Sequence, residues 1–96
     1  MRLNFLNPSR SYDADKSRVQ FWGYDSAFEI SFFVEADALK QLCPDISDNE
    51  SEILHAFDTA RSRIIEVAEK IYSNGKMRKF MLILQAKDFK EDKLEK

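Results

Sequence analysis

The sequence has few of the residues that build phosphate loops, disulfides and metal sites. Its 96 residues include two glycines, Gly23 and Gly75, one cysteine, Cys43, and one histidine, His55. Two separated glycines exclude a P-loop and a dinucleotide fingerprint, because both need clustered glycines for close backbone approach to phosphate. A single cysteine excludes an intrachain disulfide, and with one histidine it supplies too few ligands for structural zinc. We therefore expect no metal and no cofactor.

Long hydrophobic runs are also absent. The longest candidate, residues 80–84, has the length of a strand, whereas a membrane-spanning helix needs about 20 apolar residues. The first residues lack the apolar core of a signal peptide. We therefore expect no membrane association and a cytoplasmic location.

The composition is that of a folded domain with nearly balanced charge. Hydrophobic residues make up 44% of the chain and aromatic residues 12%, which is more apolar surface than disordered chains carry. The formal net charge of −2 lacks the basic excess of a dedicated nucleic-acid binder. Residues 1–86 are predicted to form one domain, and the charged residues 87–96 a frayed tail.

The N-terminal third predicts the strands of a meander. Apolar and polar residues alternate in residues 3–5, 17–24 and 27–34, with polar turns between them. Such alternation, rich in β-branched and aromatic residues, is typical of half-buried antiparallel strands. Gly23 inside the second run indicates a bulge or a close backbone approach.

The next segment predicts two helices. Residues 35–42 favour a short helix that Pro44 ends. Ser47 and Glu50 match a capping box, and from there apolar residues recur at helical spacing to about Ser73, which predicts one long helix.

Residues 77–85 return to a strand pattern. Both faces of this segment carry apolar residues, which indicates a central or doubly covered strand. The predicted fold class is α+β, with a small antiparallel sheet packed on one long and one short helix. The sheet combines the N-terminal meander with this C-terminal strand.

Four residues of the N-terminal hairpin are the candidate binding group: Arg10, Tyr12, Trp22 and Tyr24. If Tyr12 pairs near the strand of Trp22, their rings share an outward face beside cationic side chains. Aromatic rings with cations stack nucleic-acid bases or anchor protein partners. Alternatively, the large rings close a second small core, because large aromatic residues are buried on average.

Several blocks of the sequence resemble a known bacterial family. They are NPSRSYDA at 7–14, RVQFWGYDS at 18–26, EISFFV at 29–34 and DALK at 37–40. These blocks are similar to the small proteins known as domain of unknown function 1488, although Leu6 stands where that pattern has proline. The resemblance implies a single α+β domain in a cytoplasmic bacterial protein, and it implies no activity, substrate or cofactor.

The leading functional hypothesis is a non-enzymatic binding or regulatory module. Its partner is another protein or a second copy paired through a sheet edge. One alternative is weak nucleic-acid binding through aromatic and basic residues: Trp22, Tyr24, Arg10, Arg18 and Arg78. Another is a small enzyme that uses either His55 or a polar group: Arg10, Tyr12 and Asp13. For His55 to act as a general base, the fold must supply a partner that the sequence does not show.

Overall fold

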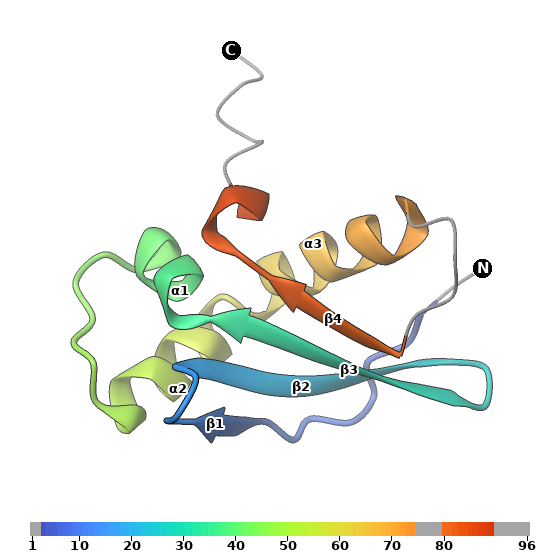
Figure 1. Cartoon of the computed structure of the whole chain (residues 1–96), viewed down its shortest axis with the longest axis horizontal. Helices are drawn as coiled ribbons and strands as arrows, with labels where there is room; N and C mark the ends of the chain where they lie inside the picture. Colours follow the sequence, from blue (N-terminus) through green and yellow to red (C-terminus); the bar gives the residue numbers. More distant parts are fainter. Residues whose placement is uncertain (1–2, 75–79, 90–96) are drawn as a thin grey trace, which may run out of the picture.

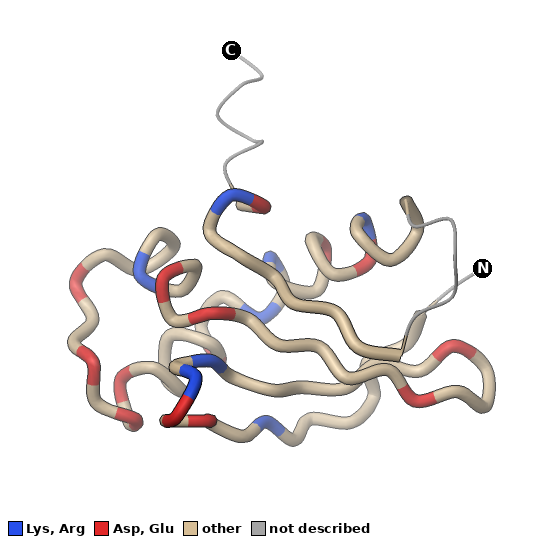
Figure 2. Tube along the Cα trace, viewed as in Figure 1, with Lys and Arg blue, Asp and Glu red and all other residues tan. Residues whose placement is uncertain are grey.

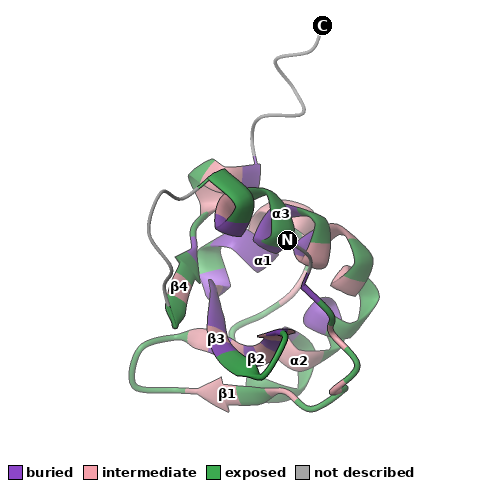
Figure 3. Ribbon diagram, turned by 90° about the vertical axis from the view of Figure 1, so that its right-hand side faces the viewer, coloured by how far each residue is buried: buried purple, intermediate pink, exposed green. Residues whose placement is uncertain are grey.

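A four-stranded sheet carries the helices of this protein on one of its faces (Figures 1 and 3). The structure is a computed structural model that describes residues 3–74 and 80–89. The elements in chain order are β1 (Ser11–Asp13), β2 (Arg18–Asp25), β3 (Phe28–Glu35), α1 (Ala36–Leu42), α2 (Glu50–Thr59), α3 (Arg61–Asn74), β4 (Met81–Leu84) and the 3-10 helix η1 (Ala86–Phe89). The predicted α+β class is confirmed.

The first three strands form the predicted antiparallel meander. β1 pairs with β2, and β2 pairs with β3 over its whole length, from Arg18 opposite Glu35 to Asp25 opposite Phe28. Ser17 and Ser26 occupy the two hairpin turns with positive φ values of 52° and 57°. The predicted strand at residues 3–5 contributes an isolated bridge, in which Asn4 pairs with Tyr24.

The position of β4 differs from the prediction. It pairs parallel with β3 and is the last strand in the order β1-β2-β3-β4, so the sheet is mixed and β4 is neither central nor doubly covered. Met81 and Ile83 remain 52% and 37% exposed. The part of the predicted strand at residues 77–79 lies outside the described residues.

The predicted long helix is two helices, α2 and α3, which are interrupted at Ala60. The backbone there has φ −99° and ψ 14°, away from helical values. The apolar stripe continues across the break, since Phe57 and Ile64 are both fully buried. The predicted cap at Ser47 is wrong because Asn49 caps α2, and its Oδ1 accepts a 2.8 Å hydrogen bond from the backbone N–H of Glu52.

The core contains a cluster of aromatic rings between sheet and helices. The rings of Phe21 and Phe57 lie 5.1 Å apart, and those of Phe21 and Phe32 lie 5.4 Å apart. The ring of Phe5 lies on Gly23, where an added Cβ would come within 2.7 Å of the Phe5 ring. Gly23 therefore marks a close approach, which is one of the two alternatives that the sequence left open.

The packed structure continues past the predicted domain boundary at residue 86. Residues 86–89 form η1, and Phe89 is only 3% exposed. The rest of the predicted frayed tail, residues 90–96, lies outside the described residues. Within the ranges 3–74 and 80–89, no helix has the length and apolar character needed to cross a membrane.

Candidate functional site

The two faces of the sheet have different environments. Along β2, residues alternate between buried positions beneath the helices, such as Val19 and Phe21, and partly exposed positions on the opposite side. Figure 3 shows the described helices on one side of the sheet only. We call the other side the open face, and the strand registers place these residues on it: Ser11, Asp13, Arg18, Gln20, Trp22, Tyr24, Glu29, Ser31, Phe33, Glu35, Met81 and Ile83.

An apolar strip crosses the open face from β2 to β4. One row of paired positions runs from Trp22 through Ser31 to Met81. The neighbouring row runs from Gln20 through Phe33 to Ile83. The strip therefore contains four side chains of unequal exposure: Phe33 is only 9% exposed, Trp22 is half-buried, and Met81 and Ile83 are exposed. The two polar residues between them satisfy each other, since Gln20 Nε2 donates to Ser31 Oγ at 3.3 Å.

Arg18 covers one end of this strip. Its guanidinium carbon lies 3.9 Å from the centroid of the Phe33 ring, a cation–π geometry. Asp13 lies beside it, with Oδ2 3.8 Å from Arg18 Nε. The buried Nε of Arg18 has no hydrogen-bond partner among the described residues, so ring stacking and a longer-range ion pair hold this cation in place.

Tyr24 lies at the opposite end of β2 and uses its hydroxyl within the protein. The hydroxyl donates to Glu29 Oε2 at 2.9 Å and accepts from Asn7 Nδ2 at 3.2 Å. These bonds join the N-terminal segment to β2 and β3. The Tyr24 ring is therefore held rigidly on the sheet.

Carboxylates outnumber cations around the apolar strip. By the strand registers, Arg18 is the one basic residue that the described strands place on the open face, against three acidic residues: Asp13, Glu29 and Glu35. Figure 2 marks the acidic and basic positions along the chain. The net negative charge of the open face repels a polyanion such as nucleic acid. A partner surface that combines apolar and basic groups is complementary to the open face.

The structure separates the four residues of the predicted binding group. Trp22 and Tyr24 share the open face and are both half-buried. Tyr12 pairs with Val19 and packs toward the helices, against the hydrophobic core. Arg10 turns to α2 on that same side of the sheet.

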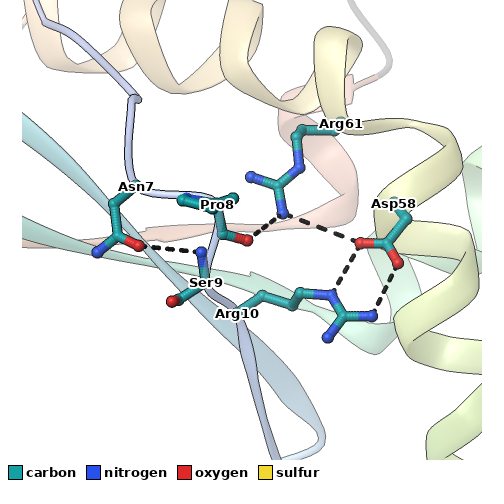
Figure 4. A network of polar contacts seen from close by, with 6 residues as sticks. All are labelled: Asn7, Pro8, Ser9, Arg10, Asp58 and Arg61. Atoms are coloured by element: carbon teal, nitrogen blue, oxygen red, sulfur yellow. Dashed lines mark hydrogen bonds and ion pairs between the residues drawn. The ribbon is translucent and has the colours of Figure 1, made fainter.

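Arg10 belongs to a network that fastens the N-terminal segment to the helices (Figure 4). Its Nε and Nη2 donate to Oδ1 and Oδ2 of Asp58, each at 2.8 Å. Arg61 Nη2 donates to the carbonyl of Pro8 at 2.9 Å and lies 3.9 Å from Asp58 Oδ1. The hydrogen bonds from Arg10 hold the pKa of Asp58 below its ordinary value, against a smaller opposing effect of burial.

Arg10 is one of the predicted binding residues, whereas its network partners Asp58 and Arg61 were not among the predicted site residues. The blocks shared with the bacterial family cover Arg10, but nothing in residue spacing links it to Asp58 or Arg61. A bidentate Arg–Asp pair fixes geometry, and both partners are already engaged. The network is therefore a structural fastening of the chain.

The remaining chemistry-bearing residues do not converge. His55 is exposed on α2, in the helical layer, and Cys43 is half-buried against the core. A shallow depression of about 220 Å³ lies at the start of α1, between Lys16 and Asp37. Among the residues with described positions, no three His, Cys, Asp or Glu side chains gather as a metal site would require.

The fold defines a class: a small α+β domain whose four-stranded sheet has all of the described helices on one face. Residues 3–84 match the model of the family described as protein of unknown function (DUF1488). The chain belongs to this family, which confirms the resemblance seen in the sequence.

A solved structure shows the same fold. It is the crystal structure of a protein of unknown function from the DUF1488 family from Shewanella loihica PV-4. The similarity has a TM-score of 0.70 at 20% sequence identity and covers 82% of this chain and 89% of that chain. The search of curated proteins found no match.

Proposed function

We propose that this protein is a non-enzymatic binding module of the bacterial cytoplasm that holds a protein partner on its open face. The observation that carries the proposal is the apolar strip of Trp22, Phe33, Met81 and Ile83 on a sheet face that none of the described helices covers. Contiguous apolar surface with a polar rim is typical of interaction sites. The packed aromatic core behind the strip already holds it in place, so binding a partner loses little conformational entropy of the sheet.

The charges on the open face indicate the chemistry of the partner. Asp13, Glu29 and Glu35 border the strip, and Arg18 is held over the Phe33 ring. An apolar partner segment flanked by lysine or arginine residues matches this arrangement in both apolar contact and charge. Trp22 is the expected anchor, because tryptophan is enriched among residues that dominate binding energy.

Nucleic-acid binding has less support from the same geometry. Arg10 is paired with Asp58, on the helix side of the sheet, and Arg78 lies outside the described residues. Arg18 is the one candidate cation that remains on the open face. Binding of a phosphate backbone depends on its neutralisation by cations, and the three carboxylates of the open face oppose it. An enzyme has less support as well, because His55 is exposed in the helical layer and is not among the residues that line the depression at the start of α1.

Site-specific photo-crosslinking tests the proposed face. A photoreactive phenylalanine analogue replaces Trp22 in the full-length protein, and the matched control carries it at Thr59, which is exposed in the helical layer. Irradiated bacterial cells should give a discrete protein adduct from position 22 that is missing from position 59. A nucleic-acid adduct, equal adducts from both positions, or no adduct from position 22 would each overturn the proposal.

The charge argument has its own test with the partner that the adduct identifies. Glu29→Lys and Glu35→Lys together should weaken its binding at least about tenfold in calorimetry, because basic groups then face basic groups. Glu66→Lys and Glu69→Lys on α3 are the control pair and should leave binding unchanged. Affinity that is unaffected by the sheet substitutions would contradict a basic partner segment.

A further inference from the structure

Exposed apolar side chains gather around β4. Phe80 and Met81 are 54% and 52% exposed, and Ile83 is 37% exposed. Phe28 is 45% exposed, and its ring lies 5.8 Å from that of Phe80. Leu6 is the one other large apolar side chain that is exposed in the described parts of the chain. The outer border of the sheet is therefore apolar on both of its faces.

The backbone of β4 offers unpaired groups on the same border. Ser31 N–H donates to the carbonyl of Phe80 at 2.9 Å. Backbone groups of successive strand residues point to opposite sides, so those of Met81 and Ile83 point away from β3. β4 is the last strand of the described sheet. Two N–H and two C=O groups are thus available for another strand.

The described residues of this edge, Met81–Leu84, lack the charges and prolines that usually prevent edge pairing. Natural edge strands carry charges, prolines or bulges that discourage addition of another strand. β4 has the sequence MLIL, which contains neither a charged residue nor a proline. It pairs with β3 in unbroken register, so it has no bulge. The opposite edge strand, β1, is three residues of sequence SYD and ends in a charge. The apolar edge is therefore a specific feature of β4.

We infer that β4 pairs antiparallel with β4 of a second copy of this chain. A two-fold axis at Leu82 places Met81 opposite Ile83 of the second copy. In an antiparallel ladder such hydrogen-bonded pairs exchange two bonds each, so this register forms four bonds and satisfies every outward backbone group of Met81 and Ile83. The result is a continuous eight-stranded sheet.

The side chains and charges of β4 suit this occupant. On the open face, Met81 and Ile83 from both copies form one apolar cluster. On the helix face, Phe80 lies opposite Leu84 of the second copy. β4 carries no charge, so self-pairing opposes no like charges. A second copy thus provides the uncharged apolar strand that this edge requires.

The pairing goes beyond the proposed function, and it shares Met81 and Ile83 with the apolar strip but not Trp22. Trp22 lies on β2, two strands from the paired edge, and stays accessible in the dimer. The two strips of the open face become one surface with two anchors. Failure of the dimer would leave the crosslinking result at position 22 intact, and the reverse also holds.

Light scattering and sedimentation of the purified full-length protein test the association. The wild type should be a dimer, and Ile83→Lys should be a monomer, because a charge then enters the shared cluster. Circular dichroism should show that this variant is folded. Thr59→Lys is the control and should stay dimeric. A wild type that is monomeric at its highest soluble concentration would overturn the inference, as would a dimer that Ile83→Lys leaves unchanged.

Cysteine crosslinking tests the register in a Cys43→Ser background. Leu82→Cys places two cysteines across a non-hydrogen-bonded pair with Cα atoms about 4.5 Å apart, within the range that a disulfide spans. Met81→Cys is the matched control, since its Cα atoms in the two copies lie roughly 9 Å apart by strand geometry, too far for a disulfide. A disulfide-linked dimer should form from Leu82→Cys only. Linkage of both variants, of neither, or of Met81→Cys alone would show that the proposed pairing is wrong.

Discussion

Arg10 and Asp58 are 48 residues apart in the chain and meet through two parallel hydrogen bonds of 2.8 Å. Arg10 precedes β1, and Asp58 lies in the last turn of α2. The pair thus joins the sheet edge to the helical layer. Both side chains are partly exposed, at 33% and 43%, so water screens the interaction.

Removal of this ion pair should cost little stability, with a defined pH dependence. Arg10 lowers the pKa of Asp58 from its ordinary 3.8. A lowered folded-state pKa stabilises the protein above the unfolded value, and this contribution is lost as the pH falls through the folded value. Asp58→Asn should therefore lower the free energy of unfolding by at most about 1 kcal/mol at neutral pH. The difference from wild type should shrink below about pH 4.

Urea unfolding across this pH range measures the effect. Arg10→Gln and the double variant complete a mutant cycle, in which the two single losses should not add. A difference between wild type and Asp58→Asn that persists undiminished in acid would show that the pair is not its cause.

Gly23→Ala should destabilise the protein by about 1–3 kcal/mol through overpacking. The new Cβ would lie 2.7 Å from the ring of Phe5 and 3.0 Å from that of Phe32. In a Phe5→Ala background the same substitution should cost clearly less, because the closest contact is gone. Thermal unfolding of the four proteins measures the coupling. Equal costs in both backgrounds would contradict the role of Phe5.

Ser26→Gly should stabilise the protein by about 0.5–1 kcal/mol. Ser26 and Ala27 form a two-residue turn between β2 and β3, and Ser26 has φ 57°, which glycine adopts without the steric cost of a side chain. Ala27→Gly is the matched control and should be destabilising. Ala27 has no positive φ, so glycine there relieves no strain and only raises the conformational entropy of the unfolded chain. A lower melting temperature for Ser26→Gly would contradict this account.

Tyr72→Phe should cost about 1–3 kcal/mol of stability. The Tyr72 hydroxyl donates to Asp25 Oδ2 at 2.6 Å, and both residues are buried. Removal of the donor leaves a buried carboxyl oxygen without that bond. Tyr24→Phe is the control, since its bond to Glu29 is exposed to water, and it should cost less. Denaturant unfolding of both variants compares the two, and a larger loss for Tyr24→Phe would contradict the assignment.

Local patterns in the sequence were sufficient to predict most of the elements. Period-two alternation located β2 and β3, and apolar spacing located the combined span of α2 and α3. The break at Ala60 and the cap at Asn49 were missed. Ser47, Asp48 and Asn49 are all acceptable caps, so only the path of the chain determines which one is used.

The candidate site was predicted in part. Trp22 and Tyr24 do share a partly exposed face, as one of the two interpretations required. The register of β1 could not be derived from sequence, and a shift of one residue reverses the face of every side chain. That register turned Tyr12 toward the core. The partners of Arg10 depend on the packing of α2 against the sheet, which no local pattern encodes.

The parallel addition of β4 also affects how the chain reaches its fold. The β2–β3 hairpin closes over a two-residue turn, but β4 pairs with β3 across a much longer separation, since Ser31 and Met81 are 50 positions apart in the sequence. Loop closure of that length must precede any gain from the contact. We expect the meander and its aromatic cluster to form first and β4 to dock last. An apolar strand that docks late is exposed to other chains while the protein folds, and rapid burial against a second copy would end that exposure.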